Sequence, residues 1–157
     1  MNIKTVWAVY FSGTGTTEKV ATTLAKDLAE RLGAGYDTYC FNLPQAREKD
    51  LSFGPEDLVV LFSFSKLSQE GKMILGYRKE AGYQTLAFIS RAFVPEEERA
   101  DIQLFAYRGE AKEYHSMTAP AALVDALVVA VSEQMGEASV ENLSHLYHMK
   151  KTYALNR

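Results

Sequence analysis

The stretch VYFSGTGTTEKVA, Val9 to Ala21, decides the fold, because it joins an apolar run to a cluster of Gly, Ser and Thr and then to a helical pattern. The run KTVWAVYF, Lys4 to Phe11, predicts a buried first strand. After the cluster, apolar residues recur at helical spacing, at Val20, Leu24, Leu28 and Leu32, and Gly33 stops the pattern. A strand, a glycine-rich loop and a helix start in this order predict an anion site, since backbone N–H groups, hydroxyls and the positive end of a helix dipole surround one spot.

The rest of the chain alternates short apolar runs with helical patterns, which is typical of βαβ units and a parallel sheet. Four further strands are expected, over Tyr36 to Leu43, Leu58 to Phe64, Thr85 to Ser90 and Ile102 to Tyr107. The third strand, LVVLFSF, is nearly all apolar and is expected at the centre of the sheet. A helix is expected over Gln69 to Ala81, ended by Gly82, and PEEERA predicts a turn or two of helix before the last strand.

Two helical patterns follow each other at the C-terminal end with no strand between them. Thr118 with Pro120 marks the start of the first, and its length favours a helix over a strand despite its valines. Its buried face is expected to carry Leu123, Leu127, Ala130 and Val131. Ser139 is expected to cap the last helix, whose apolar stripe is Val140, Leu143, Tyr147 and Ala154.

Composition narrows the class of protein. A chain of 157 residues that is 47% hydrophobic predicts a single domain over residues 1–157. A net charge of −3 gives no basic surface for nucleic acid or an anionic membrane. The lone Cys40 excludes an internal disulfide, and no signal peptide or run of ~20 apolar residues is readable, so we expect a cytoplasmic protein.

The anion loop differs from two common phosphate motifs. It lacks the Gly-Lys-Ser/Thr end of a Walker A loop, and Glu18 stands where the dinucleotide fingerprint needs a third Gly. Instead it closely resembles the phosphate loop of flavodoxins, with Thr16 at a position where many of them have Asn. The resemblance implies FMN as cofactor, held by hydroxyls and by backbone at Ser12, Gly13, Thr14, Gly15, Thr16 and Thr17. It covers roughly the first 60 residues.

A second resemblance begins at the third strand. SFSKLSQEGKMILGYRKEAGYQTLAFIS, the later ADIQLFAY and the two final helices are similar to the sugar isomerase (SIS) domain of RpiR-type transcriptional regulators. In that family a Ser-x-Ser loop binds a sugar phosphate at the next helix N-terminus. The resemblance implies phosphosugar binding by Ser63, Ser65 and Ser68, although Lys66 stands where many members have Gly. It covers roughly residues 58 to 157.

Both families share one architecture, so the two resemblances imply the same α/β fold. This is the flavodoxin-like three-layer α/β/α sandwich, with a five-stranded parallel sheet of order 2-1-3-4-5. The sequence is interpreted as an engineered chimera of a flavodoxin-type segment (residues 1–60) and an SIS-type segment (residues 61–157), joined near Leu58 to Phe64. A natural divergent protein is the alternative.

The chimera interpretation predicts no evolved catalysis, and the sequence offers neither a catalytic set nor a metal site. Weak FMN binding at the phosphate loop is expected, because the ring-flanking loops of flavodoxins are missing unless Phe64 or Phe93 replaces them. The alternatives are a phosphosugar-binding SIS-type module and a natural FMN electron carrier. The partner is a small phosphorylated ligand in every case, and the oligomeric state stays open.

Overall fold

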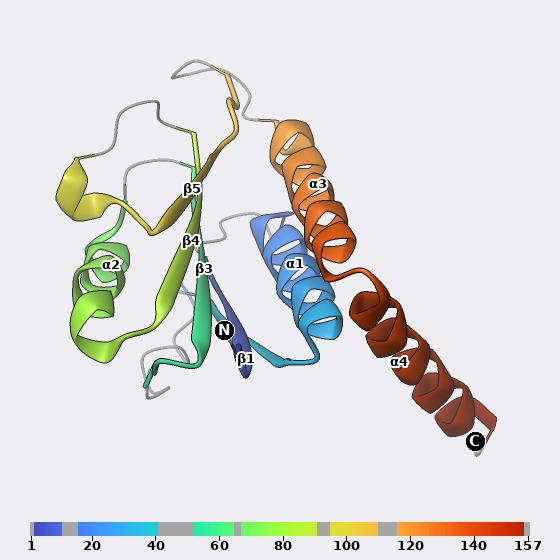
Figure 1. Cartoon of the computed structure of the whole chain (residues 1–157). Coiled ribbons are helices and arrows are strands. Elements are labelled where there is room, and N and C mark those ends of the chain that lie inside the picture. Colours follow the sequence, from blue (N-terminus) through green and yellow to red (C-terminus); the bar gives the residue numbers. More distant parts are fainter. Residues whose placement is uncertain are drawn as a thin grey trace.

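The computed structural model of the chain describes residues 2–10, 16–40, 52–64, 67–90, 95–109 and 116–155. Five parallel strands form one sheet in the order β2-β1-β3-β4-β5 (Figure 1). The predicted flavodoxin-like fold and strand order are therefore confirmed. The strand order reverses direction at β1, which lies between β2 and β3 in the sheet.

The strands and helices lie close to their predicted ranges. The strands are β1 (Thr5–Tyr10), β2 (Gly35–Cys40), β3 (Asp57–Ser63), β4 (Gln84–Ile89) and β5 (Ile102–Phe105). The helices are α1 (Thr16–Leu32), α2 (Gln69–Ala81), the 3₁₀ helix η2 (Glu96–Glu98), α3 (Thr118–Met135) and α4 (Glu137–Leu155). Gly82 ends α2 in the left-handed conformation with φ of 81°, which a residue with a Cβ rarely adopts.

Helices cover both faces of the sheet (Figure 1). On one face α1 and α3 pack against alternate residues of the central strands, with Leu24 of α1, Val60 of β3 and Phe88 of β4 in one buried cluster. On the other face α2 packs through Ile74 and Leu75 against the intervening strand residues. The central strands are thus buried on both sides, as their continuous apolar runs predict.

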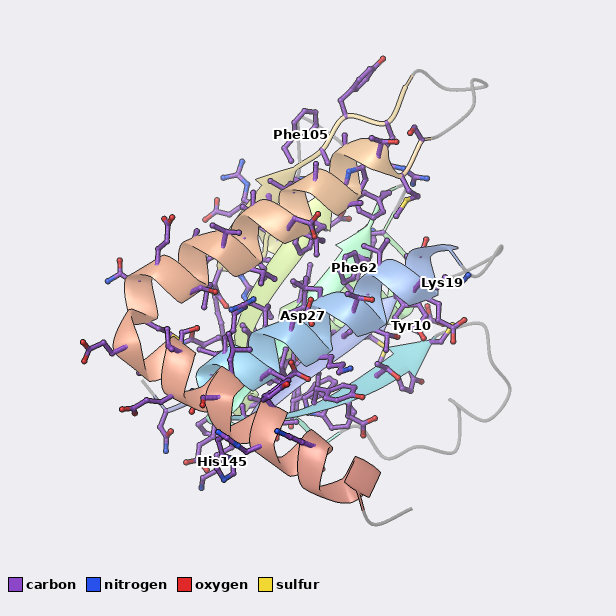
Figure 2. The ribbon with its side chains drawn as sticks, turned by 90° about the vertical axis from the view of Figure 1, so that its right-hand side faces the viewer. Tyr10, Lys19, Asp27, Phe62, Phe105 and His145 are labelled. Carbon is purple, nitrogen blue, oxygen red and sulfur yellow. The ribbon has the colours of Figure 1, made fainter. Side chains whose placement is uncertain are left out.

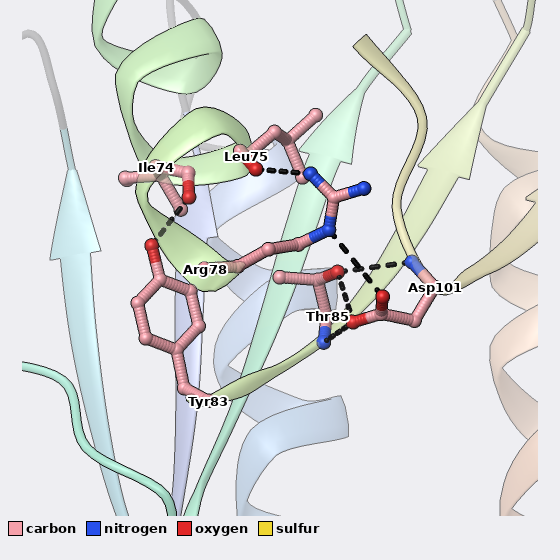
Figure 3. Close-up of polar contacts among 6 residues, drawn as sticks. All are labelled: Ile74, Leu75, Arg78, Tyr83, Thr85 and Asp101. Atoms are coloured by element: carbon pink, nitrogen blue, oxygen red, sulfur yellow. Dashed lines mark hydrogen bonds and ion pairs between the residues drawn. The ribbon is translucent and has the colours of Figure 1, made fainter. Parts of the chain in front are cut away.

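A polar cluster fastens β5 to β4 at the amino ends of these strands (Figure 3). The Asp101 carboxylate accepts hydrogen bonds from the backbone N–H of Thr85 at 2.8 Å and from its hydroxyl at 2.7 Å. The Arg78 Nε of α2 lies 3.3 Å from the other carboxylate oxygen. The hydroxyl of the buried Tyr83 donates to the Ile74 carbonyl of the same helix. These contacts fix α2 and the start of β5 on β4.

The C-terminal helices depart from the sequence prediction. The helix α4 begins at Glu137, so Ser139 lies inside it and is no cap; it is 2% exposed, and its hydroxyl has no hydrogen-bond partner among the described residues. Two residues of the predicted stripe of α4, Val140 and Tyr147, are 66% and 65% exposed. Leu143 is partly buried, and the side chain of Ala154 lies outside the described part of the chain. Instead α4 contacts α1 through Asn142, whose side-chain amide donates to the Arg31 carbonyl at 2.8 Å.

The buried face of α3 is also turned from its predicted position. Its buried residues are Pro120, Val124 and Val128, whereas Leu123 and Leu127 are partly buried beside the same core. The predicted core residue Ala130 is exposed, because it lies on the outer side of the helix. By length and composition alone, α3 is the one described helix that matches a membrane span, yet Val124 and Val128 pack into the core of this domain.

Candidate functional site

The candidate site lies at the carboxyl edge of the sheet, where β1 and β3 end side by side. Tyr10, the last residue of β1, is in register with Phe62 of β3, so these two strands end at the same level of the sheet. Figure 2 shows Tyr10 and Phe62 close to the end of α1 that carries Lys19. This is the topological switch point of the strand order, where doubly wound folds form a ligand crevice.

Only part of the predicted FMN phosphate loop lies within the described residues. Ser12, Gly13, Thr14 and Gly15 lie outside them, and Thr16 is placed as the first residue of α1 by its backbone alone. Thr17 is partly buried in the first turn of α1, where the positive end of the helix dipole favours an anion. The assignment of these residues to a phosphate therefore stays a prediction.

Tyr10 provides a buried hydroxyl beneath this edge. It is 3% exposed, and burial raises the pKa of its phenol. Electrostatic interactions with Glu18 and then with Cys40 act in the same direction, while hydrogen bonds with the Thr22 and Thr38 side chains oppose the shift. A neutral phenol at the end of β1 thus ties the strand to α1 and β2 below the predicted loop.

The second predicted loop connects β3 to α2, and the structure describes two of its three serines. Ser63 is the partly buried last residue of β3, and Ser65 lies outside the described residues. Ser68 is the N-cap of α2, where its hydroxyl accepts the Gly71 N–H at 3.1 Å. Its capping role uses the Ser68 hydroxyl as an acceptor, which leaves its proton for a ligand at the helix N-terminus.

Two residues that sequence reasoning did not single out, Ser90 and Arg108, contact Phe64 directly after β3. The Ser90 hydroxyl, after β4, donates to the Phe64 carbonyl at 2.6 Å. The Arg108 guanidinium, after β5, lies 4.9 Å from the centre of the Phe64 ring. The Arg108 Nε also lies 3.3 Å from the Ser116 carbonyl at the start of α3. The signal for Arg108 was its place as the first residue after the expected strand ending at Tyr107.

The same contacts bear on flavin binding. Phe64 is only 8% exposed, because its ring packs into the core and Arg108 lies over it. It therefore does not present a face for stacking on an isoalloxazine ring, which corrects the expectation that it could replace a ring-flanking aromatic residue. Phe93, the other residue considered for that role, lies outside the described residues.

A separate groove of ≈ 250 Å³ lies beside α2 and does not fit a phosphate. Aromatic and apolar side chains dominate its lining, with Glu70 as the charged member; the lining residues are Tyr39, Phe53, Glu70, Met73, Ile74, Tyr77 and Tyr83. A carboxylate repels an anion, and no lysine or arginine is among the described residues that line the groove. Across the described ranges no group of three or more His, Cys, Asp or Glu residues is placed to hold a metal ion.

No protein-family model and no curated protein sequence matches the chain. Solved structures do match. The sugar isomerase domain of an RpiR transcription factor from Sphaerobacter thermophilus superposes with a TM-score of 0.73 at 18% identity, over 94% of this chain and 80% of that one. The Vibrio vulnificus NanR protein complexed with ManNAc-6P has a TM-score of 0.68 at 19% identity, over 92% of this chain and 55% of its own.

A third match is an E. coli CFT073 protein in complex with a phosphosugar, with a TM-score of 0.62 at 21% identity, over 92% of this chain and 76% of that one. These alignments extend over more than nine tenths of the chain, so the likeness is not confined to residues 58–157. They provide no separate support for a flavodoxin-derived segment or for a junction near Leu58. The comparisons therefore assign to the whole chain the fold that sugar isomerase domains share.

Proposed function

We propose that this protein is a phosphosugar-binding module of the SIS type, with the ligand at the carboxyl edge of β1 and β3. The carrying observation is the fold match over nearly the whole chain to sugar isomerase domains and to two proteins that hold phosphosugars. This reverses the order of preference from the sequence, where FMN came first. A fold shared at 17–22% identity does not identify the substrate. The assignment of a ligand class therefore depends on the local geometry of the site.

The geometry supports a phosphorylated ligand in two ways. The strands β1 and β3 end side by side, and the next helix after each strand begins at Thr16 and at Gln69. Hydroxyl side chains lie at both places, with Thr17 in the first turn of α1 and Ser68 as the cap of α2. We assign the phosphate to these N–H and hydroxyl donors, and the sugar to the crevice between the loops.

FMN remains a second candidate ligand, favoured by the glycine-rich sequence that leads into Thr17. Hydroxyls and the start of α1 fit its phosphate end, whereas the buried ring of Phe64 offers no stacking surface for the flavin. If FMN binds, its isoalloxazine ring supplies the electron-transfer chemistry and these residues hold only the phosphate. The interpretation as an engineered chimera likewise stays a proposal that rests on the two sequence resemblances.

The test is a calorimetric titration of the purified protein with three phosphorylated ligands: ManNAc-6P, the different phosphosugar bound in the E. coli complex, and FMN. The controls without a phosphate are N-acetylmannosamine and riboflavin. We expect saturable binding of at least one phosphosugar, no binding of the unphosphorylated compounds, and weaker binding by the Thr17→Ala variant, which loses a proposed donor in the first turn of α1. Thr23→Ala is the control, because Thr23 is exposed on the outer side of α1. Binding of FMN alone would replace the proposed ligand with the flavin, and equal binding of unphosphorylated sugar would contradict the phosphate assignment.

A further inference from the structure

Arg108 follows β5 in the chain, but its guanidinium lies beside the residue that follows β3. The strand β5 ends at Phe105, and in the sheet β4 separates it from β3. The Arg108 guanidinium nevertheless lies 4.9 Å from the centre of the Phe64 ring, and Phe64 directly follows the last residue of β3. This contact places a positive charge beside the residue that follows β3, and β1 is the neighbouring strand on the other side of β3.

Two contacts orient this charge, one with the Phe64 ring and one with the Ser116 carbonyl. The Phe64 ring below it is buried, and the Ser90 hydroxyl holds the Phe64 carbonyl at 2.6 Å. The Ser116 carbonyl accepts from the Arg108 Nε at 3.3 Å, and the Ser116 hydroxyl in turn accepts the Thr118 N–H at 3.2 Å at the start of α3. An arginine oriented by stacking and by a backbone acceptor loses less entropy when it binds an anion.

Burial supports the same view of Arg108. Loss of solvent lowers the pKa of its guanidinium, although an arginine side chain keeps its charge at neutral pH. A partly desolvated cation attracts a phosphate more strongly than one in bulk water. The hydroxyl donors at this edge, Thr17, Ser63 and Ser68, are neutral, whereas a phosphate monoester carries about −1.5 to −2 charges at pH 7.

We propose that Arg108 is the cationic contact for the phosphate of the ligand, reaching it across the end of β4. This inference rests on the proposed function only in that a phosphorylated ligand binds at the β1–β3 edge, and it holds for a phosphosugar or for another phosphate. The guanidinium fork binds phosphate oxygens in pairs, which a lysine ammonium does not do. Arg108 therefore sets a preference for a phosphodianion over a neutral sugar.

The test compares Arg108→Gln and Arg108→Lys with Arg99→Gln. Arg99 follows η2 and precedes β5, so it is an exposed arginine at the opposite end of that strand and its loss removes the same charge. Each protein is titrated separately with three compounds at three salt concentrations. The compounds are ManNAc-6P, the different phosphosugar bound in the E. coli complex, and inorganic phosphate. We expect Arg108→Gln to weaken binding by about tenfold or more and to flatten the dependence of Kd on salt. Arg108→Lys should fall between, and Arg99→Gln should match the wild type.

A second measurement needs no variant. Arginine modification by phenylglyoxal, followed at Arg108 by peptide mass spectrometry, should slow when inorganic phosphate is added, while modification of Arg99 should not. A merely structural role for Arg108 would lower the melting temperature of Arg108→Gln but leave the salt dependence of Kd unchanged, and this result would overturn the inference.

The two proposals fail in different ways. If the wild type binds phosphosugars and Arg108→Gln binds them equally well, the inference on Arg108 is wrong and the proposed function stands. If only inorganic phosphate or FMN binds, and Arg108→Gln weakens it, the phosphosugar assignment is wrong and the role of Arg108 stands. If no phosphorylated compound binds or protects Arg108, both are wrong.

Discussion

Two glycines of α2 allow a paired test of how closely its first turn packs against the candidate loop. An ideal Cβ at Gly71 would lie 2.7 Å from Leu67 Cδ1 and 3.2 Å from Leu67 Cγ, whereas at Gly76 it would meet nothing within 4 Å. Alanine in place of glycine stabilises a helix by about 0.5–1 kcal/mol, so Gly76→Ala should raise the free energy of unfolding by that amount. Gly71→Ala has the same backbone advantage but must displace Leu67, at a cost of about 1–3 kcal/mol.

The two variants should therefore differ in stability by about 1–3 kcal/mol, measured by urea unfolding followed by circular dichroism. Because Leu67 directly precedes the cap residue Ser68, Gly71→Ala should also weaken binding of a phosphorylated ligand, whereas Gly76→Ala should not. Adding Leu67→Ala to Gly71→Ala removes the conflict, so the two changes should be non-additive in a double-mutant cycle. Equal stabilisation by Gly71→Ala and Gly76→Ala would refute the reasoning from the Leu67 contact.

Three further predictions concern the β4–β5 region. Asp101→Asn should cost about 1–2 kcal/mol at pH 7, because the half-exposed carboxylate loses charge-assisted contacts with Thr85 and Arg78. Burial would raise the pKa of Asp101, but hydrogen bonds from Thr85 and Arg78 outweigh it and lower the pKa. The greater stability of the wild type over Asp101→Asn in urea unfolding should therefore vanish as pH falls below about 4. A stability difference that persists at pH 2 would contradict this. Burial raises the pKa of Tyr83 to about 12. The stabilising effect of the Tyr83 phenol should therefore be complete below pH ~10 and lost as pH rises toward 12. Tyr83→Phe should remove this pH dependence of the free energy of unfolding at alkaline pH. Phe88→Ala should cost about 3–5 kcal/mol in chemical denaturation, because Phe88 is fully buried and stacks on Phe62 at 4.9 Å; a loss below 1 kcal/mol would show that the core closes around the cavity.

Strand and helix positions could be predicted from the sequence because the spacing of apolar residues marks the buried face of each element and glycines mark the helix ends. The continuous apolar run at Leu58 to Phe64 correctly predicts a strand covered on both faces, observed as β3. Gly33 and Gly82 have positive φ at the ends of α1 and α2, as their places after apolar patterns indicate. The strand order came from the resemblance to two families that share it, since periodicity alone does not order parallel strands.

Contacts that depend on the angle between elements could not be predicted in this way. The outer exposure of Val140 and Tyr147 follows from the direction in which α4 leaves Gly136, and an apolar stripe does not encode that direction. Ser139 fits the local pattern of a cap, yet the helix begins two residues earlier and encloses it. Likewise Arg108 reaches Phe64 across a strand that lies far from both in the sequence, so no local motif marks the pair.

The register of Tyr10 with Phe62 has a consequence for how a bound ligand affects unfolding. It sets the end of β1 next to the end of β3, although α1 and β2 lie between these strands in the chain. A phosphate that contacts the start of α1 and the start of α2 would link these two helices as a removable crosslink. Such a ligand binds the folded state alone, so its addition should slow unfolding and protect the β1–β3 hydrogen bonds from exchange.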